Sequence, residues 1–225
     1  MILVIASHPD DEVLGCGGTI ARLTQGGEEV SLVVLGEGLT SRTDGSERTP
    51  PGRSAAIDDD CRAAGRILGL HDVVFFHLPD NRFDTVPLLD IVKKLEGVIA
   101  ETRPSVIYTQ HGGDLNIDHA ITFRATLTAV RPLRGRSVRS LLAYEVPSST
   151  EWAFGQFSPR FCAQRFVDIT ATLDAKIRAM QAYQSEARPS PHPRSSESLI
   201  ANARRWGSMV GLDAAEAFAV VWEIV

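Results

Sequence analysis

Short apolar runs alternate with helical patterns along most of the 225-residue chain. The runs are rich in β-branched residues and nearly continuous, which is typical of strands that are covered on both faces. We predict strands at 1–6, 30–36, 73–78, 106–110, 141–146, 165–169 and 218–224, and helices near 13–25, 54–69, 86–102, 119–131, 171–186 and 196–211. This alternation predicts an α/β fold: a Rossmann-like, mainly parallel, doubly wound sheet flanked by helices.

The length and composition fit a single domain over residues 1–225, because 44% hydrophobic residues are enough for a core and no linker or repeat interrupts the pattern. A net charge of −5 argues against a nucleic-acid partner. Every apolar run is shorter than the roughly 20 residues of a membrane span. The three cysteines show no paired spacing, which favours a reducing compartment, and we expect a cytoplasmic protein.

The stretch IASHPDDEVLGCGG, residues 5–18, places a histidine and three acids directly after the first predicted strand. Ligands of open parallel sheets bind at the carboxyl ends of strands, so this cluster lies where a site is expected. Adjacent carboxylates repel each other unless a cation is near. His8 and Asp11 are spaced so that both side chains can face one metal ion. Of the neighbours Asp10 and Asp11, one would bind the metal while the other faces a metal-bound water.

A second polar loop, YTQHGGDLNIDHAITF at 108–123, follows the predicted strand 106–110 in the same way. It carries His111, Asp114, Asn116, Asp118 and His119, and one of these residues could complete a set of two histidines and one aspartate. Three protein ligands leave a position for water, which is the pattern of a catalytic zinc site. These ligand types suit zinc and other first-row divalent ions, so they do not fix the identity of the metal.

Both motifs also have structural explanations. Asp10 or Asp11 could cap the helix that follows the first motif, and Asn116 or Asp118 could cap the helix that begins near His119. Two other functions are open. A phosphoesterase would use two metals about 4 Å apart and more ligands than are evident here. A non-catalytic sugar or nucleotide binder would be expected to show the GxGxxG order of a phosphate-binding loop, which this chain lacks.

The motifs HPDDE (8–12) and NIDH (116–119) resemble those of the LmbE-like, or PIG-L, family of zinc-dependent N-acetylglucosaminyl de-N-acetylases. The resemblance covers essentially the whole chain, since the order of strands and helices also agrees. It implies an LmbE-like fold and a hydrolase. The implied substrate is an N-acetylated amino sugar, free or in a conjugate, and the products are an amine and acetate.

The resemblance also implies roles for individual residues. His8, Asp11 and His119 would bind Zn²⁺, and Asp10 would be the general base that takes a proton from the metal-bound water. The family commonly has a histidine where this chain has Asn116. An amide can donate a hydrogen bond to an oxyanion but cannot shuttle a proton. This substitution leaves open a degenerate, inactive member of the same fold.

Asp118 would support this site from behind the ligands. Arg53 is similar to a substrate-contacting arginine of the family. His111 and His192 are further predicted substrate contacts. His192 lies in the polar segment 186–197, whose Arg194 and Ser195 could also touch sugar hydroxyls or a phosphate. The predicted partner is a small N-acetylated sugar. The apolar side chains of the segment 148–161 also suggest a contact in a homo-oligomer, although packing beneath a loop would explain them equally well.

Overall fold

The computed structural model describes the backbone of residues 1–38 and 53–225, and the side chains of 1–38 and 55–225. The described strands are β1 (Ile2–Ala6), β2 (Val30–Gly36), β3 (Asp72–Leu78), β4 (Val106–Gln110), β5 (Ser140–Tyr144), β6 (Arg165–Asp168) and β7 (Ala215–Glu223). The described α-helices are α1 (Asp11–Gln25), α2 (Arg53–Leu68), α3 (Leu88–Thr102), α4 (Ile117–Ala129), α5 (Leu173–Ala182) and α6 (Ser196–Ser208). Two short 3₁₀ turns, η2 (Phe83–Thr85) and η3 (Glu151–Ala153), lie in the connections. The predicted order of strands and helices is confirmed.

The described strands form one sheet in the order β3-β2-β1-β4-β5-β7-β6. β1 pairs in parallel with both β2 and β4, and β5 continues the parallel part next to β4. β7 is antiparallel to both of its neighbours, β5 and β6. The prediction of a mainly parallel sheet is therefore confirmed. The strand order changes direction between β1 and β4, so a crevice is expected at their carboxyl ends.

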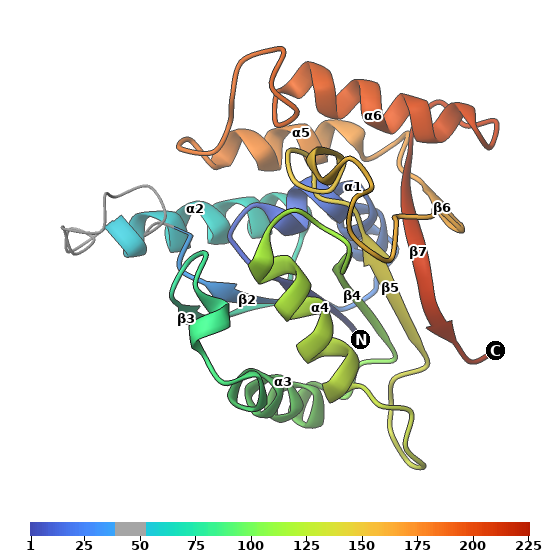
Figure 1. The fold of residues 1–225 in the computed structure, drawn as a ribbon. Coiled ribbons are helices and arrows are strands. Elements are labelled where there is room, and N and C mark those ends of the chain that lie inside the picture. Colours follow the sequence, from blue (N-terminus) through green and yellow to red (C-terminus); the bar gives the residue numbers. More distant parts are fainter. Residues whose placement is uncertain (39–52) are drawn as a thin grey trace.

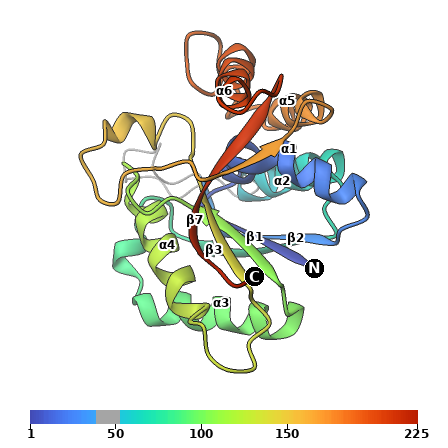
Figure 2. The same ribbon diagram turned by 90° about the vertical axis from the view of Figure 1, so that its right-hand side faces the viewer.

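Helices cover both faces of the sheet (Figures 1 and 2). Alternate residues of β1 explain this arrangement, because Val4 packs with α1, α2 and α5 while Leu3 and Ile5 pack with α3 and α4. Every residue of β1 is buried. A strand that is buried on both faces has no polar side to expose, which is why its sequence, ILVIA, is apolar throughout.

Helix α1 is interrupted at Cys16, whose backbone angles (φ −144°, ψ 21°) are not helical. The N–H groups of Gly18 and Thr19 just beyond the break donate to the carboxylate of Glu216 on β7, at 3.0 and 2.7 Å. Lys176 of α5 donates to the same carboxylate at 2.5 Å, and both charged side chains are buried. This buried pair therefore supplies the partners that the broken helix lacks.

Several predicted boundaries are wrong by a few residues, including the end of α6, which lies at Ser208 rather than at 211. β7 begins at Ala215 rather than at 218, because its first residues pair with β6. α5 ends at Ala182 rather than at 186, and the Tyr183 that follows donates its hydroxyl to Glu12 Oε1 at 2.6 Å. Within the residues that the structure describes, none of the helices is long and apolar enough to cross a membrane.

Candidate metal centre

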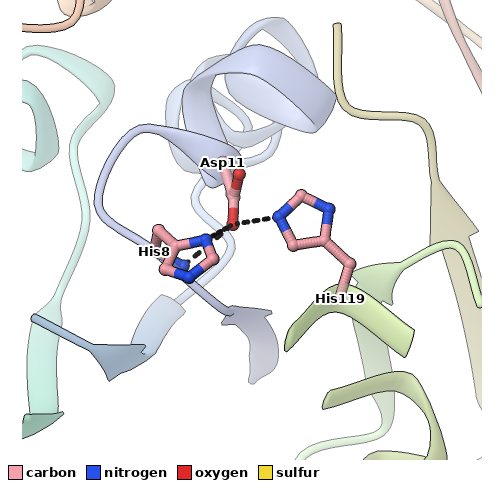
Figure 3. Close-up of side chains that lie close together, drawn as sticks. All are labelled: His8, Asp11 and His119. Carbon is pink, nitrogen blue, oxygen red and sulfur yellow. Dashed lines mark hydrogen bonds and ion pairs between the residues drawn. The ribbon is translucent and has the colours of Figure 1, made fainter. Parts of the chain in front are cut away.

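The two sequence motifs meet at the carboxyl ends of the neighbouring strands β1 and β4. His8 and Asp11 lie in the turn after β1 and at the start of α1, and His119 lies in the first turn of α4. Figure 3 shows the two imidazole rings on either side of the Asp11 carboxylate. One possible ligand atom from each of the three residues lies within 4.8 Å of the others. The strand order thus brings together groups that are far apart in the sequence.

One oxygen of Asp11 is the centre of this group. Asp11 Oδ2 lies 3.6 Å from His8 Nδ1 and 3.3 Å from His119 Nε2. The same oxygen accepts hydrogen bonds from the His8 backbone N–H at 2.8 Å and from Gln110 Nε2 at 2.9 Å. The other oxygen, Oδ1, is buried and has no hydrogen-bond partner among the described residues. A buried carboxylate oxygen without a partner is costly, so a further partner such as a cation would stabilise it.

The far side of the His8 ring is held by two carboxylates. His8 Nε2 lies 2.9 Å from Asp118 Oδ2 and 3.1 Å from Asp80 Oδ1. Asp118 is itself fixed by the backbone N–H groups of Asn81 and Phe83, at 2.6 and 3.0 Å. Carboxylates at Nε2 favour the tautomer with the proton on that nitrogen, which leaves the lone pair of Nδ1 facing Asp11.

His119 is oriented in a similar way by Asp114. His119 Nδ1 lies 3.2 Å from Asp114 Oδ1, while Nε2 faces Asp11. Asp114 accepts hydrogen bonds from the Ser149 hydroxyl, from the Thr150 hydroxyl at 2.6 Å and from the Asn116 backbone N–H at 2.9 Å. Histidines that bind metals typically have such a carboxylate on their second ring nitrogen.

The electrostatics of this group favour positive charge. Burial alone would lower the pKa of both imidazoles, but neighbouring carboxylates raise the pKa of His8 well above its ordinary value and that of His119 to about 9. Burial would raise the pKa of Asp11, yet His119 and His8 hold it well below its ordinary range. The carboxylates therefore change the pKa of the imidazoles more than burial does. The space between the carboxylates and the rings attracts a cation.

Asp10 stands beside the three candidate ligands and contacts neither imidazole in any described hydrogen bond or ion pair. It is the N-cap residue of α1, with a left-handed backbone (φ 98°), but its side chain makes no capping hydrogen bond. The carboxylate is 2% exposed, and its Oδ2 accepts a hydrogen bond from Arg194 Nη1 at 2.8 Å. Burial raises the pKa of Asp10 well above its ordinary value, against the lowering effect of Arg194.

A polar cavity of about 70 Å³ opens next to these groups. It is lined by His8, Pro9, Asp10, Gly38, Asp80, Asn81, Asn116, Glu186 and Arg194. Asn116 caps α4, since its side-chain oxygen accepts from the Asp118 backbone N–H at 2.9 Å. Asn116 therefore has the predicted capping role, and its side chain also lines the cavity.

The predicted substrate contacts are placed differently. Arg53 begins α2, and its side chain lies outside the described part of the structure. His111 is buried, and its Nε2 lies 2.7 Å from the Pro159 carbonyl oxygen. His192 Nδ1 accepts a hydrogen bond from the backbone N–H of Arg194 at 3.1 Å. Neither histidine is among the described residues that line the 70 Å³ cavity, so substrate contact by these residues stays a prediction.

The sequence predicted no role of their own for Asp80, Gln110 and Asp114, and it did not link Arg194 to Asp10. Asp80 follows β3 and Gln110 ends β4, so the rule that sites form at carboxyl strand ends could have found both. Asp114 was noted only as part of a loop. Arg194 lies in the connection between α5 and α6, and nothing in its local sequence indicates a contact with Asp10.

The family model described as "PIG-L: GlcNAc-PI de-N-acetylase" matches residues 3–130, which include both motifs. The chain belongs to the PIG-L family. Among curated relatives, this PIG-L chain is 35% identical to the "Uncharacterized deacetylase YaiS" of Escherichia coli K12, over 66% of the chain and 75% of that protein. It is 29% identical to the "Probable N-acetyl-alpha-D-glucosaminyl L-malate deacetylase 2" of Bacillus cereus, over 82% of the chain and 83% of that protein.

Solved structures confirm the fold of this PIG-L chain. The 4-carboxy-2-hydroxymuconate hydratase GalB from Pseudomonas putida KT2440 superposes with a TM-score of 0.78, covering 100% of this chain and 97% of that chain at 22% identity. At that level of identity the likeness concerns the fold alone. Because GalB is a hydratase, the fold by itself does not determine the reaction, and the site residues must carry the argument.

Proposed function

We propose that this PIG-L protein is a zinc-dependent deacetylase that hydrolyses the N-acetyl group of an N-acetylated amino sugar to give an amine and acetate. The observation that carries the proposal is the convergence of His8, Asp11 and His119 beside a cavity lined by the separate carboxylate of Asp10. The names of the relatives support the same reaction. They include the two deacetylases above and a diacetylchitobiose deacetylase of Thermococcus kodakarensis, 28% identical over 82% of this chain and 69% of that protein.

The residues present fit a divalent cation. His8 Nδ1, His119 Nε2 and the Asp11 carboxylate would hold it, and the unpartnered Asp11 Oδ1 is a further donor within the group. Two imidazoles and one carboxylate are a donor set that zinc favours at catalytic sites, where a fourth position stays open. Such a cation supplies a nucleophile at neutral pH by lowering the pKa of water, and it polarises the acyl carbonyl.

The chain's own groups would handle the protons and the developing charge. The Asp10 carboxylate, which lies next to Asp11 and lines the cavity, would accept a proton from the attacking water and return it to the departing amine nitrogen. The NH₂ group of Asn116 would donate a hydrogen bond to the developing oxyanion, while the side-chain oxygen of Asn116 stays on the helix cap. These roles make Asn116 compatible with activity, in contrast to the degenerate alternative.

Acetate release from a panel of substrates tests the proposal. The panel would contain free N-acetylhexosamines, an N-acetylated disaccharide, and nucleotide, lipid and malate conjugates of N-acetylglucosamine. We expect release from at least one class, loss of release with a chelator, and recovery when zinc is added back. Release that is insensitive to the chelator would contradict the metal-dependent mechanism. A protein that binds metal yet releases acetate from no panel member would contradict the assigned substrate class.

A further inference from the structure

Arg194, which lies outside the two motifs, donates a hydrogen bond to the proposed general base, Asp10. We propose that Arg194 is a positioning residue, which fixes the Asp10 carboxylate in the orientation needed for the reaction. This inference rests on the proposed function. Arg194 comes from the connection between α5 and α6, 184 positions after Asp10, and its Nη1 donates to Asp10 Oδ2 at 2.8 Å.

Asp10 needs a partner from outside its own helix. An N-cap aspartate usually turns its carboxylate back onto the first N–H groups of the helix, which fixes the side chain locally. Asp10 has a left-handed backbone, and its side chain makes no such capping hydrogen bond. A buried carboxylate without a local anchor depends on a tertiary contact for its orientation. The described hydrogen bond to the Asp10 side chain is the one from Arg194.

Arg194 is held firmly enough to act as that anchor. Its Nε donates to the Ser148 hydroxyl at 2.8 Å, and its Nη1 also donates to Glu186 Oε2 at 2.9 Å. Its backbone N–H donates to His192 Nδ1. The next residue, Ser195, caps α6 by accepting the Ser198 backbone N–H, so the backbone beside Arg194 is fixed at a helix start. A guanidinium with several partners loses little further freedom when it orients one more group.

Glu186 defines the geometry of the contact. The Arg194 Nη1 atom stands between Asp10 Oδ2 and Glu186 Oε2, and both carboxylates are buried. The arginine therefore cannot swing towards one carboxylate without losing the other. A lysine at this position has a single nitrogen and cannot also reach the Ser148 hydroxyl in the same fork geometry.

The competing role for Arg194 is that of a substrate anchor. Its side chain is 21% exposed and lines the 70 Å³ cavity, so an anionic group of the substrate could reach it. The two roles have different kinetic signatures. A positioning residue affects kcat and leaves KM nearly unchanged, whereas an anchor for the bound substrate affects KM.

The experiment compares Arg194→Gln and Arg194→Lys with wild type on the panel member that wild type deacetylates best. The matched control is Arg188→Gln, because Arg188 lies in the same connection, is exposed, and donates only to backbone carbonyls in the described contacts. We expect both Arg194 variants to lose about 100-fold in kcat, the scale on which a small misplacement of a reacting group acts. KM should stay within about twofold, metal content should be unchanged, and the control should behave as wild type.

Chemical rescue provides a signature that a purely structural role would not give. In Arg194→Gly, added guanidinium can occupy the space between Asp10 and Glu186, and we expect it to restore part of the lost kcat. A rise in KM at constant kcat, or turnover at the wild-type rate in both Arg194 variants, would overturn the inference.

The failure of the proposed function can be told apart from the failure of this inference. If wild type releases no acetate from any panel member, the proposed function fails, and crystal structures of wild type and Arg194→Lys then decide the positioning claim. A displaced Asp10 carboxylate in the variant supports that claim, and an unmoved one overturns it.

Discussion

Each imidazole of the site faces Asp11 with one ring nitrogen and a supporting carboxylate with the other. For His8 the supports are Asp118 and Asp80, and for His119 the support is Asp114. This arrangement selects which nitrogen carries the proton and therefore which nitrogen is available to a metal. At the scale of single residues, the supports matter as much as the ligands, because a ring in the wrong tautomer cannot bind.

Substitution of Asp118 tests this support. An asparagine offers only one acceptor oxygen, whereas Asp118 accepts from His8 Nε2 and from the backbone N–H groups of Asn81 and Phe83. We expect Asp118→Asn to weaken zinc binding by about 10- to 100-fold, measured by competition with a chromophoric chelator. Asp84→Asn, at an exposed position in the nearby η2, is the control. Zinc binding by Asp118→Asn as tight as that of wild type would contradict the role of Asp118.

The sequence predicts the site at this scale only in part. The position of the two motifs after strands and the spacing of His8 and Asp11 predicted a metal site, and the resemblance to the PIG-L family implied the full set with His119. The structure brings the three residues together. The role of Asp80 and the contact of Arg194 with Asp10 were missed because they join segments that are distant in sequence, and no local pattern records such contacts. For His111 and His192 the sequence predicts substrate contact, whereas in the structure each ring makes a hydrogen bond to the backbone. A histidine in a polar loop can have such a structural role, and the sequence does not distinguish the two.

At the scale of elements, the broken helix α1 joins the site to the body of the fold. The break at Cys16 lies only one turn beyond Asp11. The ion pair of Lys176 on α5 and Glu216 on β7 binds the backbone groups next to this break. Lys176 also donates to the Leu14 carbonyl oxygen at 2.8 Å, so it serves the other side of the same break. The stability of the pair therefore affects the segment that carries the first motif.

Removal of one member of this buried pair should be costly. We expect Glu216→Ala to lower the free energy of unfolding by about 3 kcal/mol or more, because it leaves a buried ammonium group without its counter-charge and two helix N–H groups without a partner. Urea unfolding measures the effect. Asp174→Ala removes an exposed ion pair with Arg178 on the same α5 and should change stability little. An unfolding free energy of Glu216→Ala equal to that of wild type would contradict the structural role of the pair.

The elements themselves were predictable because both faces of the sheet are covered. Continuous apolar runs between helical patterns leave few alternatives to a parallel sheet, and the predicted strands and helices agree with the structure to within a few residues. The start of β7 was missed because its first residues, Ala215–Ala217, include a glutamate that is buried only through its partner on α5. The pairing of distant elements, rather than local propensity, sets such boundaries.

At the scale of the whole molecule, the strand order accounts for the site. β1 and β4 are neighbours, so the two motifs open at the same edge of the sheet, and the segment between α5 and α6 reaches that edge through Arg194. We propose that residues 1–225 act as one domain, because β7 near the end of the chain lies inside the sheet that β1 begins. The side chains of Trp152, Phe154 and Phe157 are exposed, as a contact in a homo-oligomer would require. The homo-oligomer stays a prediction.

The most direct test of the account is to measure acetate release and zinc content on the same preparations of wild type and Asp10→Asn. Asp10 is assigned the proton transfers and not a place among the metal ligands. We expect the variant to retain the zinc content of wild type and to lose about 100- to 10,000-fold in turnover. Turnover at the wild-type rate by zinc-loaded Asp10→Asn would contradict the account.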